Sequence, residues 1–222
     1  PSKIHAHWII PQGLIAYLNY KISGTKYVVT RHGSDLMGIK GFNFIKKSIL
    51  KNSYKITVVS EALAKEVRKI DPSLKVSIIP MGIDIKKFNP SRKDPKLKKQ
   101  LGIKGKFLLF VGRLAPEKGI DLLIEAMPNV IKRNPTTKLV IIGEGTLKDE
   151  LIERVKELKI ENNIIFLGWI NNKDLPKYYA TADIFVSPSR REGSPITYIE
   201  ALSCGTKIIV GDIPISHEIV NK

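Results

Sequence analysis

The sequence predicts an α/β protein made of two Rossmann-like domains, each built on a doubly wound parallel sheet. Short runs rich in β-branched residues alternate with amphipathic stretches of helical period along all 222 residues. This alternation favours parallel strands whose connecting helices cover both faces of a sheet. Ligands of such sheets bind beyond the carboxyl ends of the strands, so functional residues are expected in the loops that follow strands.

One break rich in glycine, proline and lysine divides the runs into two sets. Three strands are predicted before it and five after it, at 27–30, 56–60, 76–80, 107–111, 139–142, 164–167, 184–187 and 208–210. Helices are predicted over 120–133 and 147–159. The pattern therefore predicts a first domain over 1–80, a linker with one short helix over 81–106, and a second domain over 107–222. Because both sets of strands are small for complete doubly wound domains, we expect a piece of a longer protein, with the first domain incomplete and the second lacking its last elements.

The chain is strongly basic, with 37 Lys and Arg against 21 Asp and Glu and a formal net charge of +16. Residues 1–80 alone carry 13 basic and 4 acidic residues, hence a net charge of +9. Such a field attracts phosphate groups or an anionic membrane surface, although a lysine-rich solvated surface has the same composition. No helix-turn-helix, RNA-recognition or zinc-finger pattern occurs, so we expect no nucleic-acid partner.

No apolar run approaches the roughly 20 residues that span a membrane, and Cys204 is the single cysteine. We therefore expect a cytoplasmic protein without disulfides, at most peripheral to a membrane. The stretch 41–55 is compatible with membrane contact, because Phe42, Ile45 and Ile49 share one helical side and lysines lie nearby. Packing of this face into the core is the alternative.

The loop after the predicted strand at 107–111 reads GRLAPEKG and leads into a predicted helix. Gly112 permits close approach of the backbone to a ligand, Arg113 offers a planar set of donors, and Lys118 adds a positive charge. The start of the helix supplies further N–H groups. These features indicate a diphosphate site, although a surface loop with two solvated cations has the same residues.

A second motif, RREGSPITYIEALSCG, follows the predicted strand at 184–187. Ser194 is predicted to cap a helix whose first residue is Pro195. Glu192 then lies in the loop and Glu200 inside the helix, so the two acids are not a general acid and base on one helical face. Near a helix N-terminus, carboxylates can instead accept hydrogen bonds from sugar or ribose hydroxyls.

The two motifs, with seven residues between Glu192 and Glu200, resemble the signature of the family-4 retaining glycosyltransferases, the group similar to glycogen synthases and bacterial lipid mannosyltransferases. The segments VVSEAL, IPMGIDIKKF and GDIPISHEIV resemble other parts of that family, so the resemblance extends over nearly the whole chain. It implies the GT-B fold of two Rossmann-like domains. It also implies transfer of a sugar from a nucleoside-diphosphate sugar to a glycan or lipid-linked acceptor, without a metal or other cofactor.

The resemblance further implies roles for matching residues. Arg113 and Lys118 would neutralise the diphosphate as the leaving group departs. Glu192 would bind the transferred sugar, Glu200 would hold the ribose, and His32, in TRHGSD, would face the reacting sugar, although a loop histidine is more often structural. The other donor-binding residues implied in this way are Gly112, Gly143, Gly145, Gly193, Ser194, Pro195, Ile196 and Thr197.

Other interpretations of the motifs stay open. The loop from Gly143 to Lys148 imitates a dinucleotide fingerprint, but Lys148 stands in place of its third glycine. No Asp-x-Asp sequence is present to hold a metal and diphosphate, and His5 and His7 lack further metal ligands nearby in sequence. The alternatives to a transferase are a non-catalytic module that binds nucleotide sugars and a nucleotide-sugar epimerase of the same fold. Binding without turnover would indicate the first, and a sugar altered on its nucleotide the second.

Overall fold

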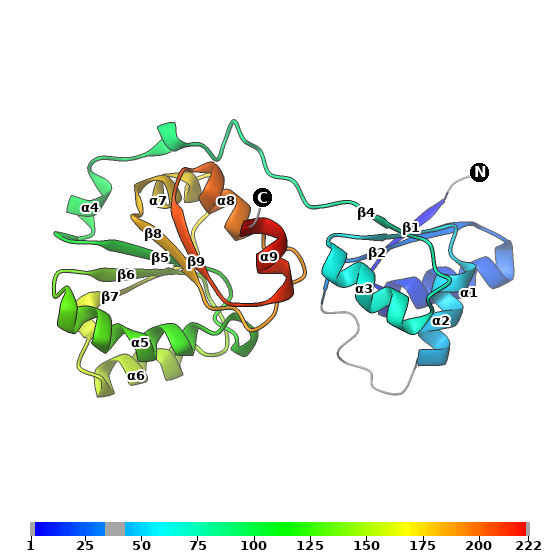
Figure 1. Cartoon of the computed structure of the whole chain (residues 1–222), viewed down its shortest axis with the longest axis horizontal. Coiled ribbons are helices and arrows are strands. Elements are labelled where there is room, and N and C mark those ends of the chain that lie inside the picture. The colour runs from blue at the N-terminus through cyan, green and yellow to red at the C-terminus, as the bar shows by residue number, and fades with distance from the viewer. Residues whose placement is uncertain (1–2, 34–42, 221–222) are drawn as a thin grey trace. The chain divides into compact units, whose positions relative to one another are not determined.

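The computed structural model describes residues 3–33 and 43–220, which form two compact units (Figure 1). The first unit extends to Met81, and the second contains Gly82–Arg191 and Pro195–Ile219. Each unit is built on a sheet of parallel strands accompanied by helices. The α/β class predicted from the sequence is therefore confirmed.

The first unit contains a parallel sheet with the strand order β1-β2-β3-β4. Its described elements are β1 (Ile4–His7), a π-helical turn (Ile9–Gly13), α1 (Leu14–Ser23), β2 (Tyr27–Arg31), α2 (Asn43–Asn52), β3 (Lys55–Val58), α3 (Glu61–Ile70) and β4 (Val76–Ile78). Tyr27 and Val29 of β2 are fully buried in its core. Helix α3 begins where the Ser60 hydroxyl accepts a hydrogen bond from the Leu63 N–H, so a side chain satisfies an otherwise unpaired donor at the helix start.

Helix α2 covers part of the stretch 41–55, for which the sequence left two interpretations, membrane contact and core packing. Ile49 is fully buried, Ile45 packs against the core, and even Lys46 is only 3% exposed. Phe42 lies outside the described residues. The apolar side formed by Ile45 and Ile49 faces the core, so the alternative interpretation of this helix is the correct one.

The second unit contains a parallel sheet with the strand order β7-β6-β5-β8-β9. Its described helices and strands are α4 (Leu97–Gln100), β5 (Phe107–Val111), α5 (Ile120–Arg133), β6 (Lys138–Ile142), α6 (Lys148–Glu157), β7 (Ile164–Gly168), α7 (Leu175–Thr181), β8 (Ile184–Ser187), α8 (Ile196–Ser203), β9 (Lys207–Val210) and α9 (Pro214–Val220), with 3₁₀ turns at Pro90–Arg92, Pro116–Lys118 and Glu161–Asn163.

Helices cover both faces of this second sheet (Figure 1). Alternate side chains of β5 point to opposite faces. Phe107 and Leu109 pack with α7 and α8, whereas Leu108 and Phe110 pack with α5 and α6. Burial of one such side chain stabilises the fold by about 1.5–3 kcal/mol. The doubly wound arrangement therefore follows from strands that are apolar on both sides.

Residues 81–106, which were expected to link the domains, fold partly onto the second unit. Leu97 of α4 is buried in the core formed with α7 and α8. The Asp183 carboxylate accepts hydrogen bonds from Lys98 Nζ and from the Phe107 N–H, each 2.7 Å long. Burial alone would raise the pKa of Asp183, but these two donors hold it below its usual range. Helix α4 is thus fixed beside the start of β5.

Candidate functional site

The order of strands in the second unit reverses between two neighbours, β5 and β8. From β5 the chain proceeds outward through β6 to β7, and it then returns to the other side of β5 as β8 and β9. Ligands of doubly wound sheets bind at such a switch point, beyond the carboxyl ends of the two strands. The GRLAPEKG loop follows β5, and the loop that leads to α8 follows β8. The fold therefore brings the two predicted donor-binding motifs to one edge of one sheet.

The loop after β5 ends in the 3₁₀ turn Pro116–Lys118, and helix α5 begins directly after Gly119, as predicted. Arg113 is exposed, and its Nη2 donates to Glu117 Oε1 over 2.8 Å. Gly119 has a left-handed φ of 64°, a conformation that glycine adopts without strain. Arg113 and Lys118 thus lie in a loop that leads into a helix N-terminus, where backbone N–H groups favour anions.

Arg190, in the loop after β8, connects this loop to the loop after β5. Its guanidinium donates to both oxygens of the Asp121 carboxylate, at 2.8 and 2.6 Å, and to the Pro116 carbonyl at 2.8 Å. Its backbone N–H donates to the Glu117 carbonyl at 2.9 Å. The hydrogen bond from Arg190 is also the main reason that the pKa of Asp121 lies below its usual range. The motifs alone assign no role to either side chain, although an arginine after one strand and an acid in the first turn after its neighbour could have indicated the pair.

Glycines allow the loops after β5 and β6 to come into backbone contact. A Cβ atom at Gly143 would lie 1.9 Å from the Gly112 carbonyl oxygen, and Gly143 also has a φ of 139°. A Cβ atom at Gly145 would lie 2.3 Å from the Leu114 carbonyl oxygen. At Gly112, by contrast, a Cβ atom would meet only the side chain of Phe110, at 3.4 Å. Gly143 and Gly145 are therefore required by packing, whereas Gly112 has no packing reason to be glycine.

The helix after β8 begins one residue later than predicted. Pro195 is the N-cap residue of α8, with φ −74° and ψ 93°, and no side chain caps this helix. The predicted capping role of Ser194 is wrong, because Pro195 is itself not helical and Ser194 lies one residue too far from the first turn. Glu192 lies in the loop, as predicted, and Thr197 in the first turn. The predicted sugar-binding stretch thus includes both the loop and the helix start.

Glu200 of α8 is buried, with 5% of its surface exposed. Its Oε2 accepts a hydrogen bond from the Tyr179 hydroxyl at 2.8 Å. Burial raises the pKa of Glu200, although the Tyr179 hydrogen bond and the charge of Lys87 oppose this shift. Burial likewise raises the pKa of Tyr179 well above its usual range and that of the Cys204 thiol to about 11. The sequence correctly places Glu200 inside a helix but gives no sign that it is buried against a tyrosine.

Three histidines of the first unit gather at the carboxyl ends of β1 and β2. His7 Nδ1 and His32 Nε2 are 2.8 Å apart, and His5 Nε2 lies 2.6 Å from the Thr30 hydroxyl. The His5, His7 and His32 rings stack in that order, with centroids 4.4 and 5.0 Å apart. His32 lies after the end of β2, so the hydrogen bonds of the sheet do not fix its position. Its contact with His7 restrains it instead. Alternation along β1 places His5 and His7 on one face, which explains their contact with each other.

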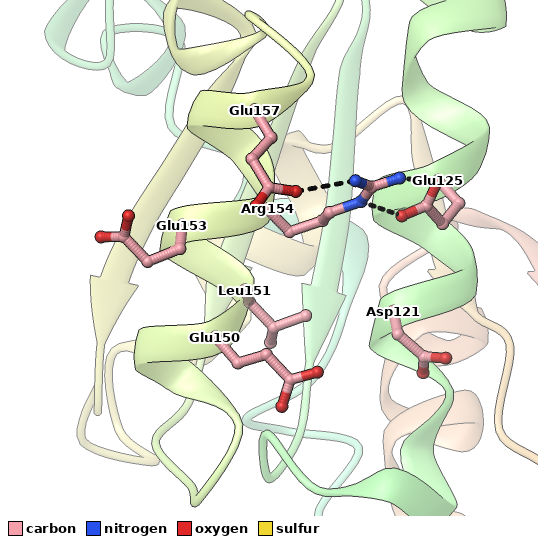
Figure 2. A pocket seen from close by; sticks show the side chains of 7 residues that line it. All are labelled: Asp121, Glu125, Glu150, Leu151, Glu153, Arg154 and Glu157. Carbon is pink, nitrogen blue, oxygen red and sulfur yellow. Dashed lines mark hydrogen bonds and ion pairs between the residues drawn. The ribbon is translucent and has the colours of Figure 1, made fainter.

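A pocket between α5 and α6 is lined by five carboxylates together with Arg154 and Leu151 (Figure 2). Arg154 donates to Glu125 and Glu157 there. Among the lining residues five acids face one arginine, and this excess of negative charge opposes binding of a diphosphate. This pocket is therefore not a candidate donor site.

Within residues 3–33 and 43–220, no group of three or more His, Cys, Asp or Glu side chains could hold a metal ion. None of the helices in these ranges has the length and apolar character needed to cross a membrane.

Comparison with known protein families identifies the family to which the chain belongs. Residues 93–222, more than half of the chain, match the family described as Glycosyl transferases group 1, and residues 1–87 match the one described as Glycosyltransferase Family 4. The chain belongs to the group 1 glycosyltransferases. The family inferred from the two motifs is thereby confirmed.

Individual relatives agree with this assignment. The uncharacterized glycosyltransferase MJ1607 of Methanocaldococcus jannaschii is 35% identical over 175 residues, which cover 76% of this chain and 45% of that protein. The α-monoglucosyldiacylglycerol synthase of Streptococcus pneumoniae is 35% identical over 150 residues, which cover 65% of this chain and 34% of that protein. The chain thus spans less than half the length of these relatives.

A solved structure confirms the GT-B fold. Anabaena Alr3699/HepE in complex with UDP has a TM-score of 0.82 to this chain at 20% sequence identity. The match covers 97% of this chain and 61% of that one.

Proposed function

We propose that the chain is the nucleotide-sugar-binding part of a retaining glycosyltransferase that works without a metal ion. The observation that carries this proposal is the position of the GRLAPEKG loop and of α8 at the β5/β8 switch point. There a ligand would meet cations, a helix start and a buried carboxylate in one place. Since the chain spans only about a third to just over half of the length of its curated relatives, the activity, substrates and partners of the whole protein belong to this proposal.

Arg113 and Lys118 bind the diphosphate of the donor in this proposal. As the bond between sugar and phosphate breaks, negative charge grows on the departing nucleoside diphosphate, and preorganised cations stabilise it as a metal ion would. Arg113 is paired with Glu117, but an exposed pair of this kind contributes at most about 1 kcal/mol. A diphosphate can therefore replace the Glu117 carboxylate, and Gly112 leaves the backbone accessible to it.

The remaining residues recognise the sugar and the nucleoside. Glu192 accepts hydrogen bonds from hydroxyls of the transferred sugar, and the backbone from Gly193 to Thr197 contacts that sugar and the phosphates. Glu200 holds the ribose, and the loop with Gly143 and Gly145 lies beside the base. His32, restrained by its contact with His7, faces the reacting sugar.

The test is a calorimetric titration of the chain with uridine, guanosine and adenosine diphosphates in excess EDTA. We expect one of them to bind more tightly than inorganic pyrophosphate, because the ribose and base add contacts. Equal affinity for all three and for pyrophosphate would contradict nucleotide recognition. Incubation with the corresponding nucleotide sugar then separates transfer of the sugar from binding without turnover and from epimerisation on the nucleotide.

We further infer a glycan or lipid-linked acceptor that the protein meets at an anionic membrane surface, on the cytoplasmic side. Ile15, Leu18 and Ile22 form an apolar stripe along α1 and are 65%, 52% and 88% exposed. Residues 1–80 carry a net charge of +9. The relative from Streptococcus is named for a glycosylated diacylglycerol, and the single, buried Cys204 suits a reducing compartment.

Cosedimentation with lipid vesicles at low salt tests this acceptor surface. We expect binding to vesicles that contain anionic lipid and loss of binding in Leu18→Glu, whose charge interrupts the stripe. Equal sedimentation with neutral and anionic vesicles would contradict it.

A further inference from the structure

We propose that Tyr179 is a positioning residue that fixes the Glu200 carboxylate for the ribose of the nucleotide; this inference rests on the proposed function. The Tyr179 hydroxyl, on α7, donates to Glu200 Oε2, on α8, over 2.8 Å. The two residues are 21 positions apart in sequence and meet only because α7 and α8 pack on the same face of the sheet. Tyr179 therefore acts on the nucleotide through Glu200 and without touching it.

Tyr179 is itself held in place from three sides. Its ring is fully buried, with centroids 6.0 Å from that of Phe88 and 5.6 Å from that of Phe185. Its carbonyl accepts a hydrogen bond from the Thr206 hydroxyl. Burial, together with the negative charge of Glu200, raises the pKa of Tyr179 well above its usual range, so the hydroxyl keeps its proton and remains a donor. A fixed donor of this kind defines where Oε2 of Glu200 must lie.

The second carboxylate oxygen of Glu200 is left for a ligand. No hydrogen bond to Oε1 is formed within the described residues, and no fully buried side-chain oxygen or nitrogen in that part of the chain lacks a partner. Oε1 therefore keeps some contact with solvent although Glu200 as a whole is buried. An oxygen that is oriented but unoccupied can accept from a ribose hydroxyl without first losing the rotamer freedom of a glutamate.

The charge state of Glu200 depends on a small set of neighbours. Tyr179 of α7 and Lys87 of the segment before α4 favour its charged form, whereas burial opposes it. Cys204 directly follows α8, one turn beyond Glu200, and burial raises the pKa of its thiol to about 11, so it stays neutral. Removal of the Tyr179 hydroxyl therefore both frees the carboxylate to move and favours its protonation.

The experiment compares Tyr179→Phe with Tyr178→Phe, which removes the same hydroxyl from the neighbouring, half-buried position of α7. Affinity is measured by calorimetry for inorganic pyrophosphate and for the tightest-binding of uridine, guanosine and adenosine diphosphates. In Tyr179→Phe we expect the nucleoside diphosphate to bind about fivefold to tenfold more weakly, with pyrophosphate unchanged. In Tyr178→Phe both affinities should equal those of the unmutated chain.

A pH series separates positioning from a merely structural role. As the pH is lowered, Glu200 becomes protonated and the ratio of nucleoside diphosphate affinity to pyrophosphate affinity should fall. In Tyr179→Phe this fall should begin at a higher pH than in the unmutated chain, because the variant lacks the hydrogen bond that favours the charged carboxylate. An equal loss for both ligands, or an unshifted pH profile, would overturn the proposal. Should Tyr179→Phe not fold, Thr206→Val removes the hydrogen bond to the Tyr179 carbonyl and leaves Glu200 intact, and a weaker but equally selective loss is expected; no loss, or an equal loss for both ligands, would overturn the proposal.

This design separates failure of the inference from failure of the proposed function. If no nucleoside diphosphate binds the unmutated chain more tightly than pyrophosphate, the proposed function fails. If one does and Tyr179→Phe leaves both its affinity and its pH profile unchanged, only the role of Tyr179 is overturned.

Discussion

Replacement of Arg190 by alanine should weaken diphosphate binding although the side chain is not assigned to the ligand. Arg190 makes two hydrogen bonds to Asp121 and one to the Pro116 carbonyl, and these hold the 3₁₀ turn that ends in Lys118. Without them, the turn and the first residues of α5 lose the side-chain contacts to the loop after β8 and keep the backbone hydrogen bond from the Arg190 N–H to the Glu117 carbonyl. The cation and the helix start would then no longer be fixed relative to each other.

The size of the effect follows from the exposure of the pair. Arg190 and Asp121 are 44% and 43% exposed, so solvent screens their attraction and the ion pair is worth about 0.2–1 kcal/mol. The bond to the Pro116 carbonyl adds about 1 kcal/mol at most. Arg190→Ala should therefore lower the free energy of unfolding by about 1–2 kcal/mol, which corresponds to a few degrees in Tm for a chain of this length. Looser positioning of the loop should reduce pyrophosphate affinity about fivefold.

The chain offers a matched control in Arg154 (Figure 2). Arg154 is also 44% exposed and also makes a two-pronged contact, with Glu125, which lies one turn after Asp121 on the same helix. Arg154→Ala should cost similar stability but leave pyrophosphate affinity unchanged, because no predicted donor residue lies in that contact. Calorimetry and thermal unfolding of both variants test this. Equal losses of affinity in the two variants, or none in Arg190→Ala, would refute the reasoning.

Three further outcomes are expected. Glu117→Gln should tighten pyrophosphate binding about twofold to fivefold by releasing Arg113, measured by calorimetry, and no gain would contradict competition between carboxylate and phosphate. Glu200→Gln should raise the free energy of unfolding at pH 8 and not at pH 4. Burial raises the pKa of Glu200, so the charged carboxylate destabilises the fold once the pH exceeds that pKa, whereas glutamine stays neutral; urea titrations that show the opposite trend would contradict the burial argument. Gly143→Ala should cost about 3 kcal/mol or more, because of its φ and the Gly112 carbonyl, whereas Gly82→Ala, with no atom within 4 Å of its Cβ, should stay within about 0.5 kcal/mol in the same assay.

Features that depend on neighbouring residues were predictable from the sequence. The strand at 107–111 and the helix at 120–133 are found with the predicted bounds. The strand is apolar throughout, and the helix has a clear apolar face together with a glycine directly before it. The same signals placed both motifs at the carboxyl ends of strands. The cap at Ser194 was the exception, since a serine before a proline fits two helix starts that differ by one residue.

Other features depend on pairs that are distant in sequence. Arg190 and Asp121 are 69 positions apart, and the sequence could indicate the pair only once β5 and β8 were known to be neighbours. From the sequence, Tyr179 is expected to be an ordinary core aromatic of its helix. Only the packing of α7 against α8 shows its hydrogen bond to Glu200. Strand β1 and helix α1 were not among the elements predicted from periodicity, because β1, IHAH, has one β-branched residue and α1 leaves apolar side chains such as Ile22 exposed. Long-range packing decided each of these features.

The central claim is that cations of the GRLAPEKG loop, and not a metal ion, bind the donor diphosphate. Calorimetric titration of a nucleoside diphosphate in excess EDTA tests it with the unmutated chain, Arg113→Ala, Lys118→Ala and Lys156→Ala, the last removing an exposed cation of α6. We expect binding to persist in EDTA, to weaken about tenfold or more in the first two variants and to stay unchanged in the third. Binding that vanishes in EDTA and returns with Mg²⁺, or equal affinity in all four proteins, would contradict the claim.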